Sequence, residues 1–241
     1  MLLLGSAAAA ARAEERVYSS HLMVDQEVTV ASRVTGIIHE IVVDRGTSVA
    51  KDQILAKLDA REFEADAREA KEQMELARAE YERAKSLSAN KVLSTADLDE
   101  KKAQYQVAVA RLEKAKTLIE YTIVRAPFSG VVTEKYARVG QKVIEDQNQP
   151  LFKITATEPL LARVYLPEEA LLTVRRGETV EVVAERFPNA KAEGVVRFIS
   201  PTVDAASGTF QVIVAVRRDP GQQVLRPGIA VKVRFLGAKT R

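Results

Sequence analysis

A segment of about sixty residues, Asp59 to Thr117, constrains the fold most, because it contains no Pro and no Gly and has a heptad pattern. Its apolar positions recur in alternating steps of four and three residues on two arms, with a break at residues 86–94. The first arm has Phe63, Ala67, Ala70, Met74, Ala77, Tyr81 and Ala84, and the second has Leu98, Lys101, Tyr105, Ala108, Leu112, Ala115 and Ile119. Lys101 is the one polar member. This spacing predicts two helices joined by a short loop, an antiparallel coiled-coil hairpin roughly 40 Å long.

The segments on either side of the predicted hairpin have period-two patterns that are typical of β-strands, and they repeat each other. The landmarks recur at an offset of 94 residues: Gly36, Gly46, Val49 and Asp52 in the first copy, and Gly130, Gly140, Val143 and Asp146 in the second. A two-residue insertion near Asn148 follows. Because each copy is too small to bury a face alone, we expect the copies to pair into one small β-sandwich.

The last part of the chain, from Thr157 onward, alternates β-branched residues with polar ones between turns rich in Pro and Gly. Roughly six strands in about 80 residues predict a small antiparallel barrel or sandwich. The expected fold is therefore mainly β with an α-helical coiled-coil hairpin. The expected boundaries are 14–27 for an N-terminal extended segment, 28–58 and 122–156 for the two sandwich halves, 59–121 for the hairpin and 157–241 for the barrel.

The first 13 residues, MLLLGSAAAAARA, form an apolar run that ends in the small-x-small pattern of a signal-peptidase site. We expect a signal-peptide-like segment and hence export, the alternative being an Ala-rich helix. The run is much shorter than the about 20 apolar residues that a membrane-spanning helix needs. The mature protein is therefore expected to be soluble, or held at a membrane only by its partners.

The composition argues against several kinds of functional site. The chain has no Cys, which excludes disulfides, thiolate metal sites and a lipid-modified N-terminal Cys. Its 36 basic and 33 acidic residues give a net charge of +3, so no nucleic-acid partner is indicated. The two His residues, His21 and His39, are too far apart for a metal cluster, and no phosphate loop or nucleophile elbow is present. We predict no catalytic residue, no cofactor and no metal site, so the protein is not expected to be an enzyme.

The order of these parts resembles that of the membrane fusion proteins, the periplasmic adaptor subunits of bacterial efflux pumps. Four stretches carry the resemblance: 36–59, 125–132 (RAPFSGVV), 199–204 (ISPTVD) and 225–228 (LRPG). The resemblance implies that the two β copies form one lipoyl-like domain, split by the hairpin and followed by a β-barrel. The family's membrane-proximal domain is expected to be absent or reduced to a strand near residues 17–23.

The resemblance also assigns a role to the tip of the hairpin. The tip in this family carries an Arg, a Leu four residues later and a Ser seven residues after that, and these dock on the outer-membrane channel. Arg83, Leu87 and Ser94 match this spacing. A purely structural role is the alternative for each: Ser94 also suits an N-cap with Asp97 at the third helical position, Leu87 could close the hairpin core, and Arg83 could be a solvated charge.

The function implied by the resemblance is that of a periplasmic adaptor. It would couple an inner-membrane, proton-driven transporter of the resistance-nodulation-division (RND) class to an outer-membrane channel, in a self-associated ring that is hexameric in the family. One alternative is an adaptor of an ABC-type exporter or type I secretion system. Another is a lipoyl- or biotinyl-like carrier or scaffold, which would present a Lys on the turn between its halves, whereas Lys57 and Lys153 lie on predicted strands.

Overall fold

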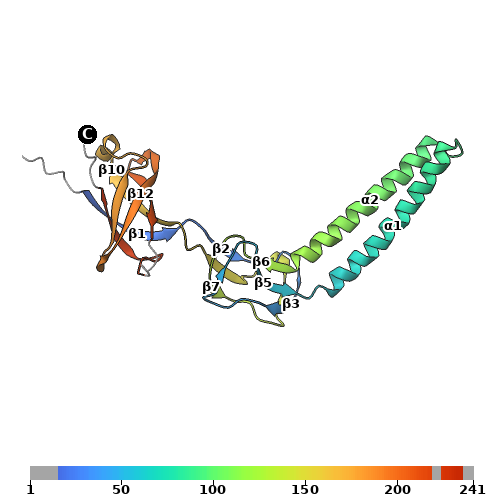
Figure 1. The fold of residues 1–241 in the computed structure, drawn as a ribbon, viewed down its shortest axis with the longest axis horizontal. Helices are drawn as coiled ribbons and strands as arrows, with labels where there is room; N and C mark the ends of the chain where they lie inside the picture. Colours follow the sequence, from blue (N-terminus) through green and yellow to red (C-terminus); the bar gives the residue numbers. More distant parts are fainter. Residues whose placement is uncertain (1–15, 219–223, 236–241) are drawn as a thin grey trace, which may run out of the picture. The chain divides into compact units, whose positions relative to one another are not determined.

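A computed structural model of the chain describes residues 16–218 and 224–235, so the signal-like segment 1–13 lies outside the described residues. The chain divides into two compact units (Figure 1). One unit comprises residues 27–155 and contains the helical hairpin and a β-sandwich. The other comprises the segments that precede and follow it, and it contains a β-barrel.

The sandwich consists of two four-stranded sheets with the strand orders β2–β9–β7–β4 and β6–β5–β3–β8. Its strands are β2 (Glu27–Val30), β3 (Gly36–Ile41), β4 (Ser48–Val49), β5 (Ile54–Leu58), β6 (Ile123–Arg125), β7 (Gly130–Lys135), β8 (Lys142–Val143) and β9 (Phe152–Thr155). Each sheet contains strands from both sides of the hairpin. Neither copy of the sequence repeat therefore forms a sheet by itself, and the expected pairing of the two halves is confirmed.

The internal repeat is visible in the backbone pairing of the short strands. β3 pairs with β8, which places Gly36 opposite Val143, and β4 pairs with β7, which places Val49 opposite Gly130. Because the copies are offset by 94 residues, each of these pairs is the repeat equivalent of the other. A strand of each copy therefore pairs with a strand of the other copy, and these pairings hold the two halves together.

The turns of the two copies also correspond. Gly46 and Gly140 both adopt left-handed conformations, with φ of +86° and +82°. Further along, Asp52 and Asn148 are the residues with positive φ, +64° and +48°. The structural counterpart of Asp52 is therefore Asn148 and not Asp146, because the two-residue insertion precedes this turn and is accommodated by a short 3-10 helix, η1 (Glu145–Gln147).

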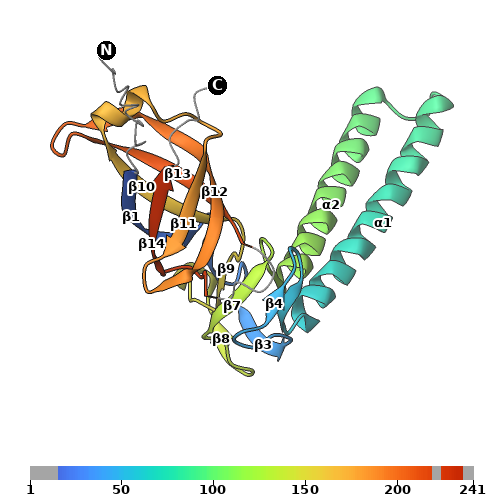
Figure 2. The ribbon, with the colours of Figure 1, turned by 60° about the vertical axis from the view of Figure 1, so that its left-hand side comes forward.

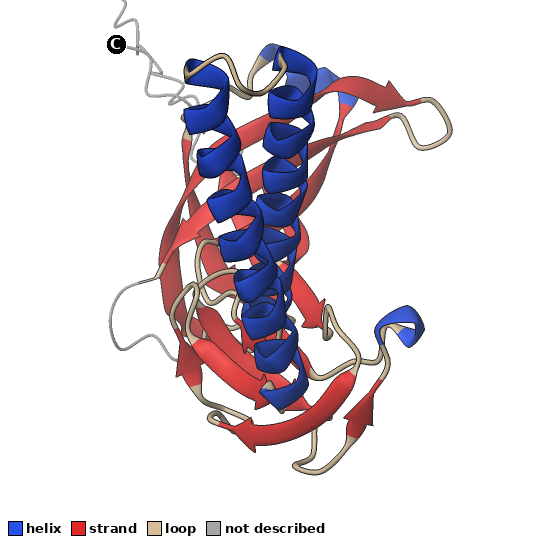
Figure 3. Ribbon diagram, turned by 90° about the vertical axis from the view of Figure 1, so that its right-hand side faces the viewer, coloured by secondary structure: helices blue, strands red, loops and turns tan. Residues whose placement is uncertain are grey.

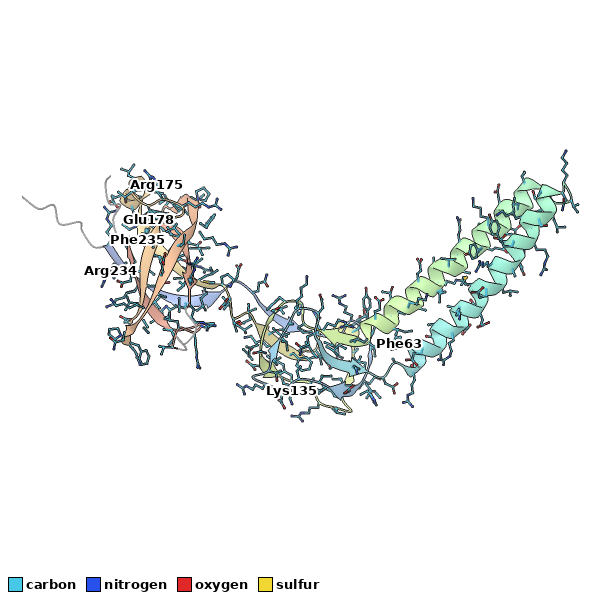
Figure 4. The ribbon with its side chains drawn as sticks, in the orientation of Figure 1. Phe63, Lys135, Arg175, Glu178, Arg234 and Phe235 are labelled. Atoms are coloured by element: carbon cyan, nitrogen blue, oxygen red, sulfur yellow. The ribbon has the colours of Figure 1, made fainter. Side chains whose placement is uncertain are left out.

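The hairpin is anchored on the core of the sandwich at its base. The largest fully buried side chains of this core are Ile38, Leu55, Val132, Val143, Leu151, Phe152 and Ile154. Phe63 from the first helix packs against this core (Figure 4). Leu118 and Tyr121 from the second helix also pack against it. The guanidinium of Arg33 lies 5.2 Å from the centroid of the Tyr121 ring, a cation–π distance. The start of the first helix and the end of the second are therefore held by packing on the sandwich core.

The two helices are α1 (Arg61–Ala89) and α2 (Thr95–Tyr121), which lie side by side (Figure 3). The predicted seam is confirmed: its residues are buried or half-buried, and those that are fully buried are Ala84, Ala108, Leu112 and Ala115. Tyr81 and Tyr105 stack across it with ring centroids 5.9 Å apart. Its polar member, Lys101, forms an ion pair of 2.8 Å with Glu80 of the facing helix, so this charge is not left unpaired.

The barrel is closed by six strands in the order β1–β10–β13–β12–β11–β14 (Figure 2). Their bounds are β1 (Arg16–Val24), β10 (Leu160–Pro167), β11 (Thr179–Ala184), β12 (Phe187–Asp204), β13 (Thr209–Arg217) and β14 (Ala230–Phe235). A 3-10 helix, η2 (Glu168–Leu172), follows β10. The interior is filled by alternate Val, Leu and Phe side chains of these strands, so the barrel is a packed core.

The structure differs from the sequence-based expectation at the N-terminal segment. We expected residues 14–27 to be an extended segment, with a strand near 17–23 as the remainder of a membrane-proximal domain. That strand is β1 and belongs to the barrel: it pairs with β14 from Arg16 to His21 and with β10 from Leu22 to Val24. Without β1 the other five strands would form an open sheet with two unpaired edges, which explains why the barrel recruits a strand from so far away in sequence.

Candidate docking site at the hairpin tip

The end of α1 forms a Schellman motif, which fixes the path of the chain into the tip. The amide of Val92 donates to the carbonyl of Leu87, and the amide of Lys91 donates to the carbonyl of Ser88, both at 2.9 Å. These are the two hydrogen bonds that define the motif. Lys91 occupies its left-handed position with φ of +59°, where Gly is the usual residue. Backbone hydrogen bonds therefore fix the conformation of this turn.

The start of α2 is fixed by Ser94. Its Oγ accepts a hydrogen bond of 3.2 Å from the amide of Asp97 and donates one of 2.6 Å to the Asp97 carboxylate. Asp97 occupies the third helical position, where a carboxylate interacts favourably with the helix dipole. The capping role considered for Ser94 is therefore present. Ser94 caps the helix and is still exposed to solvent, so a partner could also contact it.

The three residues predicted for docking lie at or near the tip, but they differ in what they do within the chain. Arg83 and Leu87 are one helical turn apart on α1, so they share a face, and both are exposed. The exposed fraction of Leu87 is 39%, whereas that of the seam residue Leu112 is 8%. Leu87 is therefore more exposed than the seam residues, and its exposed part is accessible to a partner.

Sequence analysis missed one apolar residue of the tip, Val92. Its exposed fraction is 72%, although β-branched residues are uncommon in turns. In a Schellman motif the residue at this position commonly packs on the residue that accepts its hydrogen bond, here Leu87. Both side chains are exposed nevertheless, so the tip presents two apolar groups to solvent. An apolar residue directly after a helix end was the signal that could have identified it.

Two other possibilities raised by the sequence are a metal site and a carrier Lys, and both concern side chains outside the tip. No group of three or more His, Asp or Glu residues that could hold a metal ion is found among the described residues. Lys57 forms an ion pair of 2.9 Å with Glu40, and Lys153 forms one of 2.8 Å with Glu27. The hydrogen bond between Lys153 and Glu27 raises the pKa of Lys153 and lowers that of Glu27. Both Lys residues lie on strands, which does not match the exposed turn Lys of a carrier domain.

Comparison with known families identifies the architecture. A family model described as "RND MFP, barrel-sandwich hybrid domain" matches residues 26–155, which is the sandwich with its inserted hairpin. The chain belongs to the RND membrane fusion protein family. A second model, described as "CusB-like, beta-barrel domain", matches residues 162–239. The resemblance seen in the sequence is thus confirmed, and the family is one of adaptor proteins rather than enzymes.

Individual relatives agree with this assignment. The nodulation protein NolF of Rhizobium meliloti is 31% identical over 83% of this chain and 58% of its own length. The multidrug resistance protein MdtA of Xenorhabdus bovienii is 29% identical over 86% of this chain and 55% of its own length. The chain therefore spans somewhat more than half the length of these relatives.

A solved structure shares the fold. It is a MacA–MexA chimeric protein that contains the Pseudomonas aeruginosa MexA α-hairpin domain, and it superposes with a TM-score of 0.77 at 21% identity. The match covers 93% of this chain and 79% of the other. None of the helices in the described residues is long and apolar enough to cross a membrane.

Proposed function

We propose that this membrane fusion protein is a periplasmic adaptor that couples an inner-membrane RND transporter to an outer-membrane channel for efflux. The observation that carries the proposal is the hairpin tip, where Arg83, Leu87 and Ser94 are all solvent-exposed at the spacing that the family uses for channel docking. Val92 enlarges the apolar part of this surface. In this proposal the barrel and sandwich of several copies assemble into a ring, hexameric as in the family, and the hairpins extend toward the channel.

The chemistry of the tip suits docking onto another coiled coil. Full burial of an exposed Leu side chain contributes about 1.5–3 kcal/mol, so covering the exposed 39% of Leu87 contributes roughly 1 kcal/mol, and each copy in a ring would contribute such a contact. Arg83 would supply a charged hydrogen bond next to this apolar contact, since among the described residues its side chain donates no hydrogen bond. The role of the adaptor is then mechanical, and the ordered turn at Lys91 holds the apolar residues in place.

The test is Leu87→Asp in a strain whose resistance depends on this pump. We expect loss of resistance without loss of protein, because a carboxylate at the contact must be desolvated while Leu87 lies outside the heptad seam of the hairpin. Leu172→Asp is the matched control: this Leu lies on η2 of the barrel and is 80% exposed, so the same substitution is made outside the tip. Resistance at the wild-type level in Leu87→Asp would contradict the docking assignment.

A further inference from the structure

The outer surface of the barrel is charged around β11 and β14 and apolar over β10, β13 and the middle of β12. Around β11 and β14 the outward-facing charges form ion pairs, which join Glu181 to Arg234 at 2.9 Å, Glu181 to Lys191 at 3.1 Å and Lys232 to Glu185 at 3.8 Å. The strands β10, β13 and β12 are neighbours in the barrel (Figure 2). Because inward-facing side chains already fill the barrel core, its folding does not require a second apolar surface on the outside.

The strand register brings the apolar residues of this side together. On β13 the even-numbered valines fill the interior, so Ile213 and Ala215 point outward. Val195 of β12 lies opposite Ala215, and Leu161 of β10 lies opposite Ala215 on its other side. Phe198 of β12 lies opposite Ile213. We use the name outer apolar face for six residues: Leu161, Tyr165, Val195, Phe198, Ile213 and Ala215.

The outer apolar face is accessible to solvent. The exposed fractions of its largest exposed members are 56% for Tyr165, 44% for Phe198 and 36% for Val195. The β13 residues between them are half-buried. Tyr165 lies opposite Gln211 of β13, so the face continues along this strand as far as that position. A contiguous apolar surface on the outside of a barrel is typical of a binding site, whereas apolar residues that are exposed singly need no explanation.

A cavity with two arginines adjoins one end of the outer apolar face. The cavity has a volume of about 530 Å³. Its lining includes Val195 and Ala215 of the face, and it also includes Glu158, Arg217 and Arg218. The cavity therefore places two cations next to a continuous apolar surface.

The two guanidinium groups of the cavity are not neutralised by close partners. Arg217 is exposed, and it makes no hydrogen bond or ion pair with any residue, although Glu193 lies opposite it on β12. Arg218 lies 3.7 Å from Glu158, which is at the long limit of an ion pair, and the Glu158 side chain is 70% exposed. Among the described residues that line the cavity, Glu158 is the one acid against two bases. The cavity therefore has an excess of positive charge.

We propose that this side of the barrel binds a single anionic phospholipid molecule. The phosphate lies in the cavity at Arg217 and Arg218, because a guanidinium donates paired hydrogen bonds to phosphate oxygens. An acyl chain lies along the outer apolar face. From Arg217 to Gln211, six residues along β13, the strand rises roughly 20 Å. One leaflet of a bilayer contains roughly 15 Å of hydrocarbon, so the face is long enough for one chain.

Charge and shape together favour a lipid over other occupants. A free inorganic anion would contact the arginines and leave the outer apolar face uncovered. A purely apolar partner would cover the face and leave the positive charge of the cavity without a counter-ion. A cationic cavity at one end of an apolar strip matches the head and tail of one amphiphilic molecule. The site belongs to the barrel alone, so it does not depend on docking of the hairpin tip.

The test is calorimetric titration of the full-length chain with dihexanoyl phosphatidylglycerol, kept below the concentration at which it forms micelles. We expect saturable binding of one lipid per chain. Dihexanoyl phosphatidylcholine has the same chains but a neutral headgroup, so it should bind roughly fivefold more weakly. Inorganic phosphate at the same concentration should not displace the lipid, because it cannot cover the apolar face. Absence of binding, equal affinity for the two lipids, or displacement by inorganic phosphate would overturn the proposal.

Two variants separate the headgroup from the acyl chain. Arg217→Gln should weaken binding of phosphatidylglycerol roughly fivefold and that of phosphatidylcholine less, so the preference between the two lipids should fall. Phe198→Ser should weaken binding of both lipids by a similar factor and keep the preference, because it removes apolar surface and leaves the arginines in place. An unfolded barrel would not reproduce this difference between the variants. An unchanged preference in Arg217→Gln, or wild-type affinity in Phe198→Ser, would refute the site.

Arg186→Gln is the matched control for the charge. Arg186 is exposed on the turn between β11 and β12 and does not line the cavity. Its replacement removes the same charge from the barrel, so neither lipid should change in affinity. A loss equal to that of Arg217→Gln would mean that only the net charge of the barrel matters, which would overturn the proposal.

Vesicles distinguish a site for one lipid molecule from attachment to a membrane surface. The full-length chain would be incubated with vesicles that contain phosphatidylglycerol, the vesicles would be removed by flotation, and the protein left in solution would be analysed by native mass spectrometry. We expect protein with one bound phosphatidylglycerol, and a smaller lipid-bound fraction for Arg217→Gln. Protein that floats with the vesicles while the dissolved protein carries no lipid would show surface attachment and overturn the proposal. None of these measurements depends on export, so their failure would leave the adaptor function untouched.

Discussion

Gly194 of β12 is the position in the barrel that most clearly has no room for a side chain. A methyl group there would lie 2.6 Å from Cγ1 of Val214, 2.9 Å from Cγ2 of Val180 and 3.0 Å from Cγ2 of Val182. All three valines are fully buried, so none of them can turn outward. We therefore predict that Gly194→Ala destabilises the barrel, because β12 must move away from its neighbours or the valines must leave their preferred rotamers.

The magnitude follows from two opposing effects. Overpacking of a well-packed core costs about 1–3 kcal/mol. Replacing Gly by Ala reduces the entropy of the unfolded chain, which stabilises the native state by about 0.4–1 kcal/mol. The net loss is then about 1–2 kcal/mol in the free energy of unfolding. For a barrel of roughly 100 residues this corresponds to a decrease in Tm of about 5–15 °C.

The assay is calorimetric unfolding of the full chain, with hydrogen exchange in β12 and β13 to identify the barrel transition. Val195→Ala is the matched control, because Val195 is the next residue on β12 and is partly exposed on the outside, and its Tm should change little. In the double variant Gly194→Ala with Val214→Ala, the atom at 2.6 Å is removed, so the combined loss should be smaller than the sum of the single losses. An unchanged Tm for Gly194→Ala, or strict additivity, would refute the steric argument.

Two further predictions concern the hairpin. Lys91→Gly should stabilise the tip by about 0.5–1 kcal/mol, because Lys91 has φ of +59° and Gly avoids the penalty of that conformation; hydrogen exchange of the Val92 amide should slow, and faster exchange would contradict this. Glu80→Gln should remove an acid-sensitive contribution to helicity. The bond with Lys101 lowers the pKa of Glu80 below 4.5, so its stabilisation is present above that pH and is lost as the pH falls through the lowered value. Circular dichroism should show a steeper acid loss in the wild type, and identical curves would contradict the role of the pair.

The hairpin and the sandwich could be predicted because their signals are local or repeated. The heptad spacing of residues such as Met74 and Leu112 follows directly from helix geometry. The landmarks Gly36 and Gly130 mark the same structural step in both copies, and in the structure each lies opposite a Val of the other copy. The repeat therefore carried information about a long-range pairing that no single strand pattern could give.

The barrel closure and part of the tip could not be predicted from the sequence. β1 is polar over much of its length, with Ser19 and Ser20 in its middle, and its partners are more than 130 residues away. Ser20 is buried, and its Oγ donates to the carbonyl of Arg163, a contact that only the folded barrel reveals. Val92 was missed because its exposure depends on the Schellman geometry, which a Lys at the left-handed position conceals.

The hairpin exposes more apolar surface at its tip than its own folding requires. In the described residues the large apolar side chains that α1, α2 and their loop leave exposed are Leu76, Leu87, Val92 and Val107. Leu87 and Val92 lie at the tip. A hairpin that served only as a spacer would need its seam and a polar exterior. The placement of Leu87 and Val92 therefore argues for a contact at the end of the hairpin. A variant at Leu87 should abolish that contact and leave the hairpin folded.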